Sequence, residues 1–198
     1  MSTNSIRIVH ENDAYVVIDK PALVDSQDSK EGRASVVDWL EKKYRFKGLV
    51  HRLDFGTSGL MVCAKNKSAA EDLTTILQSG EMERTYQALV LKKLEKKSGK
   101  IDIELEGKKA ITHYKTVQTF ANATLVEAEL ETGRKHQIRQ HFSLIGHPLL
   151  GEHRYGKSQA KLLFKRPALH ACKLKIKGKT YESPLPDDFQ DLIKRLGR

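Results

Sequence analysis

Short segments with strand-like patterning recur along this chain, and stretches with helical periodicity are scattered among them. Strands are predicted at residues 6–10, 15–19, 60–64, 84–91, 101–106, 111–118, 123–130 and 168–176. Helices are predicted to begin at Ser35, at a capping box of Ser68 and Glu71, at Lys135 and at Asp187. Because helices interrupt the runs of strands, we expect an α+β fold with a mixed, largely antiparallel central sheet flanked by helices and loops.

Chain length and apolar content limit the classes of protein to which this chain can belong. With 198 residues, the chain suits one compact domain with a sizeable core. It has no apolar run near the roughly 20 residues that a membrane helix needs, and its first residues do not resemble a signal peptide. Cys63 and Cys172 stand far apart in apolar settings. We therefore expect a cytoplasmic protein with two buried, reduced thiols and no membrane partner.

Positive charge is concentrated in the second half of the chain. The formal net charge is +10, and residues 132–181 hold twelve Lys and Arg but one acid, Glu152. A cluster of this kind creates a local field that favours a polyanion such as a nucleic acid. A protein with an ordinary basic face would show the same charge, so the charge alone leaves both interpretations open.

Residues 51–60, HRLDFGTSGL, carry two glycines and a carboxylate just before an apolar strand. The glycines allow a sharp turn or a close approach to a ligand, and would hold Asp54 on a loop beside Arg52. The residues alone favour a turn-forming aspartate over a catalytic one. The triplet Asp54-Phe55-Gly56 imitates a kinase motif, but the upstream glycine-rich loop is missing. GTSG lacks the Gly-Lys-Ser/Thr ending of a P-loop, so both functions are excluded.

Residues 131–141, ETGRKHQIRQH, join a predicted strand to a predicted helix. Three cations and two histidines fall in its first turns, against the preference of the helix dipole for negative charge. A local rule that is broken without visible compensation is typical of a functional site. We therefore favour an anion partner here over a solvated basic helix face.

Four histidines lie close together in this region: His136, His141, His147 and His153. Histidine is the commonest metal ligand. The intervals between these histidines are five, six and six residues, so no two of them have the four-residue spacing that places side chains on the same face of a helix. Glu152 is the only acid nearby, and no cysteine is close. We therefore expect no metal site.

Three long motifs follow one another along the sequence. They are HRLDFGTSGLMVCAK at 51–65, RTYQALV at 84–90, and TGRKHQIRQH at 132–141 continued by GHPLLGEHRYG at 146–156. Together they resemble the RluA-type family of RNA pseudouridine synthases. The resemblance covers residues 13–193 and departs after Lys20-Pro21. There the family usually has a Gly and then a His-Pro pair, whereas this chain has ALVDSQDS. Glu152 stands where the family commonly has Asp.

The resemblance implies a pseudouridine synthase-like fold with a basic cleft. It implies a single catalytic domain over residues 1–198, without a separate N-terminal RNA-binding domain. The implied activity is the isomerisation of specific uridines in structured RNA, tRNA or rRNA, to pseudouridine, with the base flipped out of its stack. The reaction needs no cofactor and no metal, and we expect the protein to be a monomer.

The resemblance also assigns roles to individual residues. Asp54 would be the catalytic carboxylate, and Arg139 would keep it ionised and oriented. Tyr86 shares a strand face with Ala88 and Val90, which alone indicates a core position, but in the family it would stack on uracil or relay its proton. RNA contacts are expected from Arg52, Ile138, Arg134 and His136, with the lysines of 157–179 following the phosphates. Attack on the ribose, addition to the base and proton steering all stay open for Asp54.

Two other functions compete with this interpretation. A non-catalytic RNA-binding protein or RNA chaperone could retain the fold, but binding alone has no use for the set of Asp54, Tyr86 and Arg139. A uridine-specific glycosylase would release the base without rejoining it. An assay of free uracil beside pseudouridine would distinguish this second alternative.

Overall fold

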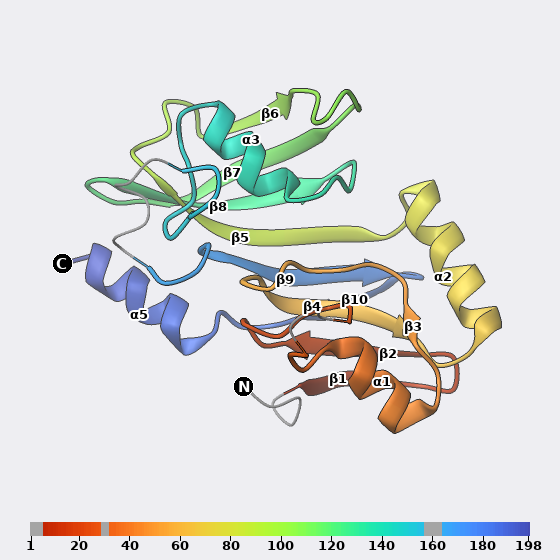
Figure 1. Ribbon diagram of the computed structural model, residues 1–198. Coiled ribbons are helices and arrows are strands. Elements are labelled where there is room, and N and C mark those ends of the chain that lie inside the picture. Colours follow the sequence, from red (N-terminus) through yellow and green to blue (C-terminus); the bar gives the residue numbers. More distant parts are fainter. Residues whose placement is uncertain (1–5, 29–31, 157–163) are drawn as a thin grey trace. The chain divides into compact units, whose positions relative to one another are not determined.

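The computed structural model describes residues 6–28, 32–156 and 164–198 (Figure 1). The chain divides into two compact units. Unit 1 runs to Glu83 and resumes over Ala171–Pro184, and unit 2 comprises Arg84–His170 and Leu185–Arg198. The chain therefore leaves one unit for the other after Glu83, after His170 and after Pro184.

Unit 1 contains a sheet whose strands follow the order β1 (Arg7–Glu11), β2 (Tyr15–Lys20), β4 (Ser58–Ala64) and β9 (Leu169–Ile176). Two short strands that the sequence did not predict join it: β3 (Gly48–Leu49) pairs with β4, and β10 (Lys179–Glu182) pairs with β9. The pairs β1–β2, β2–β4, β3–β4 and β9–β10 are antiparallel. Every residue of β4 is buried, as its continuous apolar pattern predicted.

Two helices belong to unit 1. Helix α1 (Val36–Tyr44) begins as predicted after Ser35, whose hydroxyl accepts a hydrogen bond from the N–H of Asp38. Helix α2 (Lys67–Ser79) shows that the predicted Ser68–Glu71 capping box is wrong, because Asn66 is the N-cap and its side-chain oxygen accepts from the N–H of Ala69 at 2.9 Å. Asparagine caps a helix as well as serine does, so the helix can begin directly after Asn66 rather than after Ser68.

Unit 2 contains strands in the order β5 (Glu83–Leu91), β8 (Ala123–Leu130), β7 (Ile111–Thr119) and β6 (Ser98–Asp102), all in antiparallel pairs. The prediction of a strand at 101–106 is wrong in position. The pairing of β6 with β7 begins at Ser98↔Lys115, three residues before the predicted start. After Asp102 the chain turns, and Leu105 and Lys108 exchange two backbone hydrogen bonds.

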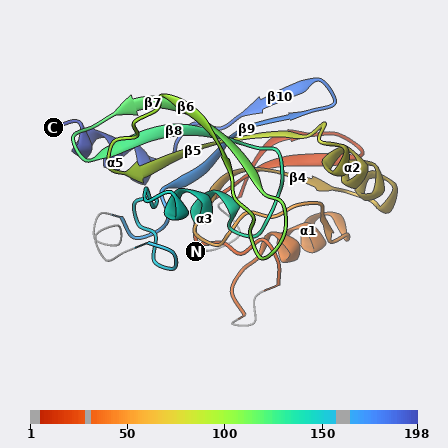
Figure 2. The same cartoon turned by 90° about the horizontal axis from the view of Figure 1, so that it is seen from above.

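Helices α3 (Gln137–Leu144) and α5 (Asp187–Leu196) complete the described part of unit 2. Helix α3 contacts β7 and runs alongside the strands of this unit (Figure 2). It begins two residues later than predicted, because His136 adopts a left-handed conformation with φ 54°. Helix α5 begins at Asp187 as predicted and buries Phe189 and Leu192 among the apolar residues of this unit.

The predicted fold class is confirmed, since helices are scattered among strands that pair largely antiparallel. Cys63 and Cys172 are both buried thiols, as their apolar surroundings indicated. Across the described ranges, no helix is both long and apolar enough to cross a bilayer.

Candidate active site

Asp54 lies in unit 1, in the loop between β3 and β4. Its carbonyl oxygen accepts a hydrogen bond from the N–H of Thr57 at 2.9 Å, which closes a tight turn. Two residues later Gly59 has φ 115°, and a Cβ atom there would lie 2.3 Å from the carbonyl oxygen of Ala171 in β9. Only glycine fits at such a close approach of two backbones. The turn and the glycine together fix the path of the chain from Asp54, which is half-buried, into β4.

Residues 23–27, which we call the clamp segment, fasten the loop that carries Asp54. The buried hydroxyl of Ser26 donates to the carbonyl oxygen of Leu53 at 2.6 Å and accepts from the N–H of Leu53 at 3.1 Å. The N–H of Leu23 donates to the carbonyl oxygen of Phe55 at 2.7 Å. One hydroxyl thus satisfies both backbone groups of the residue before Asp54, as a neighbouring strand would.

Arg52 and His51 precede Asp54 and have different roles. The exposed guanidinium of Arg52 donates from Nη1 to the side-chain oxygen of Gln27 at 2.8 Å, so the clamp segment also orients this cation. The ring of His51 accepts a hydrogen bond at Nε2 from the N–H of Val62 at 3.1 Å. An imidazole that accepts at Nε2 carries its proton on Nδ1, and His51 thereby ties the loop to β4.

Tyr86 lies in β5 of unit 2 and is 5% exposed. It pairs with Ala128 of β8, and Ala88 pairs with Val126 in the same ladder. The alternation places Tyr86, Ala88 and Val90 on one strand face, as predicted, and all three are buried. The antiparallel ladder with β8 therefore supports this phenol on a regular strand.

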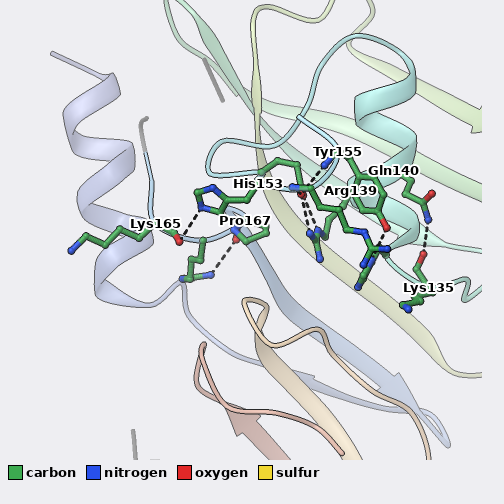
Figure 3. A network of polar contacts seen from close by, with 11 residues as sticks. Lys135, Arg139, Gln140, His153, Tyr155, Lys165 and Pro167 are labelled. Atoms are coloured by element: carbon green, nitrogen blue, oxygen red, sulfur yellow. Dashed lines mark hydrogen bonds and ion pairs between the residues drawn. The ribbon is translucent and has the colours of Figure 1, made fainter. Parts of the chain in front are cut away.

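Arg139 lies on α3 and forms a buried ion pair with Glu152. Its Nε and Nη2 atoms donate to the two carboxylate oxygens at 2.7 and 2.9 Å, and the side chains are 11% and 0% exposed (Figure 3). A planar guanidinium bound at two points cannot rotate about its last bonds, so its direction is fixed. Glu152 also accepts hydrogen bonds from the backbone N–H groups of Arg154 and Tyr155.

The surroundings of Glu152 keep it ionised. Burial opposes the charged form, but the hydrogen bonds from Arg139 and from two backbone N–H groups outweigh it and hold the pKa of Glu152 below its usual value. This carboxylate is the compensation for the cation in the first turns of α3, which the sequence pattern had left without a partner. The sequence signal for this pair was that Glu152 is the one acid among the basic residues of 132–181. A glutamate that is buried there needs a cation as its partner.

A second contact set joins the start of α3 to the loop after Glu152. The ring nitrogen Nδ1 of His136 and the hydroxyl of Tyr155 lie 2.7 Å apart, within hydrogen-bonding distance. The guanidinium carbon of Arg139 lies 5.5 Å from the centre of the Tyr155 ring, and the two side chains point toward one another (Figure 3). Arg139, His136, Glu152 and Tyr155 therefore form one polar network within unit 2.

Gln137 was not singled out from the sequence, although it organises the start of α3. Its side-chain oxygen accepts from the N–H of Arg134 and from the hydroxyl of Thr132, and its nitrogen donates to the carbonyl oxygen of Ile111 in β7. Arg134 is exposed, and its Nε donates to the carbonyl oxygen of Lys109 at 2.9 Å. Ile138, the predicted apolar wall, is 3% exposed.

The four neighbouring histidines make contacts other than with one another. His141 contacts the hydroxyl of Thr112 and the carbonyl oxygen of Ile103, and burial holds the pKa of His141 below its usual value. His147 and His153 contact the carbonyl oxygens of Leu91 and Lys165. Within the residues that the structure describes, no group of three or more His, Cys, Asp or Glu is arranged to hold a metal ion.

The lysines that were expected to follow RNA phosphates differ in their surroundings. Lys157 and Lys161 lie outside the described residues. Three others form exposed ion pairs: Lys173 with Glu182, Lys175 with Glu83 and Lys177 with Asp72. Exposed pairs of this kind contribute little to stability, so a phosphate can compete for these lysines.

The predicted site residues fall in both units. Asp54 and Arg52 belong to unit 1, where both are held by the same loop and clamp segment. The others belong to unit 2: Tyr86, Arg134, His136, Ile138 and Arg139. The structure connects Arg139 with His136 through Tyr155, and the pairing of Asp54 with residues of unit 2 stays a prediction.

Comparisons with known proteins agree on one family. A family model described as RNA pseudouridylate synthase matches residues 14–144. The ribosomal large subunit pseudouridine synthase D of Nitrosomonas europaea is 37% identical over 96% of this chain and 65% of its own length. The enzyme of that name from Haemophilus ducreyi is also 37% identical, over 96% of this chain and 70% of its own length. This chain therefore spans about two thirds of the length of these relatives.

Solved structures show the same fold. The human protein named RNA pseudouridylate synthase domain containing 4 superposes with a TM-score of 0.82 at 24% identity, over 96% of this chain and 92% of its own. The human protein named RNA pseudouridylate synthase domain containing 1 has a TM-score of 0.77 at 25% identity, over 94% of this chain and 85% of its own.

Proposed function

The chain belongs to the RNA pseudouridylate synthase family, and we propose that it converts specific uridines of large-subunit ribosomal RNA into pseudouridine. The observation that carries this proposal is the family match over residues 14–144, a range that contains Asp54, Tyr86 and Arg139. Ribosomal RNA is favoured over transfer RNA because two curated relatives are named for the large ribosomal subunit.

The proposed reaction rearranges one nucleoside without changing its composition. The bond from ribose C1′ to uracil N1 breaks, the base turns, and a bond from C1′ to C5 forms. C5 loses its hydrogen and N1 gains one, so nothing is oxidised and no group is transferred. We therefore propose that this chain needs no cofactor, and that the chemistry depends on a carboxylate, a proton acceptor and a closed site.

In this proposal Asp54 is the catalytic carboxylate, and Arg139 holds it in its charged form. The support for Arg139 is its rigid mounting on Glu152, which fixes the guanidinium plane without help from the substrate. The support for Asp54 is the set of hydrogen bonds that immobilise the loop on both sides of it. Tyr86 stacks on the uracil or accepts its proton.

RNA binding in this proposal depends on cations and one apolar residue. Arg52 takes the space of the flipped uridine or grips its phosphate, and it is exposed in an orientation that Gln27 fixes. Ile138 forms an apolar wall beside the base. Arg134 and His136 contact the phosphates, so binding weakens steeply as the salt concentration rises.

Tritium release from RNA tests the proposed function. Transcripts of large-subunit ribosomal RNA and of transfer RNA are made with uridine labelled with tritium at C5, because this hydrogen is lost when C5 becomes bonded to ribose. We expect release from the ribosomal transcript, equal to the pseudouridine formed and without free uracil. Free uracil would instead show a glycosylase, release from transfer RNA alone would correct the substrate, and binding without release would show a non-catalytic protein.

Arg139→Lys is expected to lower the turnover number by about 100-fold. Lysine keeps the positive charge but cannot make the two-point contact with Glu152, and a displacement of about 1 Å in an orienting group costs this much. Tritium release under saturating RNA measures the change.

Arg166→Lys is the matched control for this substitution. Arg166 also donates from Nε and Nη2 to one carboxylate, that of Asp188, and it lies in the same unit. The control loses an equivalent contact at a place with no proposed part in the reaction, so we expect it to retain its turnover number. An equal loss in both variants would refute the orienting role of Arg139.

A further inference from the structure

Phe55 is an exposed aromatic side chain directly after Asp54. It is 36% exposed, and among the large exposed apolar residues in the described ranges it is the only aromatic one. It stands between the HRLD and TSGL segments of the motif quoted above, and no role was assigned to it there.

A cation lies over this ring, and the backbone of a second exposed apolar residue is bonded to the backbone of Phe55. The guanidinium carbon of Arg33 is 4.6 Å from the ring centre. Arg33 is held there by an ion pair from its Nε to Asp25 at 2.9 Å, yet its side chain remains 41% exposed. The backbone of Leu23, a residue that is 42% exposed, is bonded to the carbonyl oxygen of Phe55. We call Leu23, Arg33 and Phe55 the Phe55 platform.

The chemistry of the platform suits a nucleobase. An aromatic ring with a guanidinium on it attracts the flat π-system of an unpaired base through stacking and through cation–π contacts. The cation adds attraction for the phosphate that accompanies each base, and the chain as a whole carries a net charge of +10. Other exposed apolar residues, such as Ile8 in β1, have no ring, so they cannot act in this way.

We propose that the Phe55 platform stacks an unpaired base of the RNA substrate, next to the uridine on which Asp54 acts. The inference rests on the proposed function, and it adds a binding site for a second nucleotide. Extruding a uridine from structured RNA leaves its neighbours unstacked, and a platform one residue from Asp54 would replace that lost stacking. Because stacking tolerates all bases, the platform contributes affinity for an open strand rather than for one sequence.

Binding of a short RNA tests the platform without requiring catalysis. The probe is a fluorescein-labelled single strand of nine uridines, compared with a strand of equal length whose residues are abasic. Phe55→Ala is expected to weaken binding of the uridine strand by about 5- to 100-fold, the range found for removing one stacking partner. Binding of the abasic strand should change less than twofold, because its phosphates are intact.

Three further variants separate stacking from simple apolar contact and from disturbance of the fold. Phe55→Trp should keep the affinity of the unsubstituted protein, whereas Phe55→Leu, which is apolar but has no π-face, should lose as much as Phe55→Ala. Ile8→Ala is the matched control, since Ile8 lies in the same unit and is 37% exposed. It should bind both strands normally.

The possible results also separate this proposal from the proposed function. If Phe55→Leu or Phe55→Ala binds the uridine strand as Ile8→Ala does, the platform proposal is wrong, even though the unsubstituted enzyme forms pseudouridine. If the unsubstituted protein binds neither strand, the platform proposal is also wrong. If Phe55 proves necessary for binding while no RNA yields pseudouridine, the platform stands and the proposed function fails.

Discussion

Asp54→Asn is expected to lower pseudouridine formation by at least about 1,000-fold while RNA binding stays close to normal. Asparagine has the shape of aspartate and can occupy the same turn, whose hydrogen bond from Thr57 uses the backbone of residue 54. It carries no negative charge and no basic oxygen, so it can neither attack carbon nor take a proton. Removing one negative charge from a basic protein does not weaken its attraction for phosphates.

Tritium release and fluorescence anisotropy of the same ribosomal transcript, at one fixed salt concentration, measure the two effects separately. Asp19→Asn is the control, because Asp19 is a carboxylate of unit 1 that pairs with Arg7 and accepts from the hydroxyl of Ser183, with no role in the proposed reaction. We expect this control to retain activity. Product from pure Asp54→Asn enzyme at more than a tenth of the normal rate would remove Asp54 from its proposed role.

Glu152→Gln is expected to lower the free energy of unfolding by about 3–5 kcal/mol, the usual cost of leaving a buried charge without its partner. Glutamine keeps the shape but leaves the guanidinium of Arg139, whose side chain is 11% exposed, beside a neutral group. Urea denaturation of the intact chain measures the loss. Glu83→Gln is the control, because both partners of its ion pair with Lys175 are exposed, so we expect a loss of less than about 1 kcal/mol.

Lowering the pH should reduce the difference in free energy of unfolding between Glu152→Gln and the unsubstituted protein. The pKa of Glu152 is lowered in the folded protein, so its stabilising effect is complete above the ordinary pKa of about 4.3 and is lost as the pH falls through the lower folded value. The variant has no carboxyl group at position 152, so its free energy of unfolding lacks this contribution to the pH dependence. A difference in free energy of unfolding that stays constant from pH 7 to pH 3 would show that folding does not lower the pKa of Glu152.

The sequence predicted the fold where the pattern was long and local. Strand β4 is apolar over the predicted residues 60–64 and is buried throughout, and α5 begins at the predicted residue. The errors occur where two local signals compete. Asn66 and Ser68 are both good helix caps, and the periodicity of α2 fits either one. Strand β6 was predicted too late in the chain, because the alternating apolar residues Ile101 and Ile103 indicated a strand there. Its actual position is set by its pairing with β7.

The candidate site was predictable as a set of residues but not as a set of contacts. The motifs pointed to Asp54 and Arg139, yet the partner of Arg139, Glu152, lies thirteen positions later in a loop. Ser26 gave no signal, because a serine in a loop is ordinary unless its hydroxyl is known to be buried against Leu53. Such contacts join segments distant in the chain, which periodicity and spacing do not encode.

The interleaving of the two units has a consequence for synthesis on the ribosome. Strand β4 requires β9 beside it, but Ala171 is translated long after Ala64, and α5 of unit 2 is translated last among the described elements. Until then a nascent chain exposes one edge of a strand that is apolar over residues 60–64, which is the kind of edge that pairs with strands of other chains. We therefore expect the growing polypeptide to depend on chaperones until β9 has emerged, and a single cut in the chain cannot yield two halves that each fold alone.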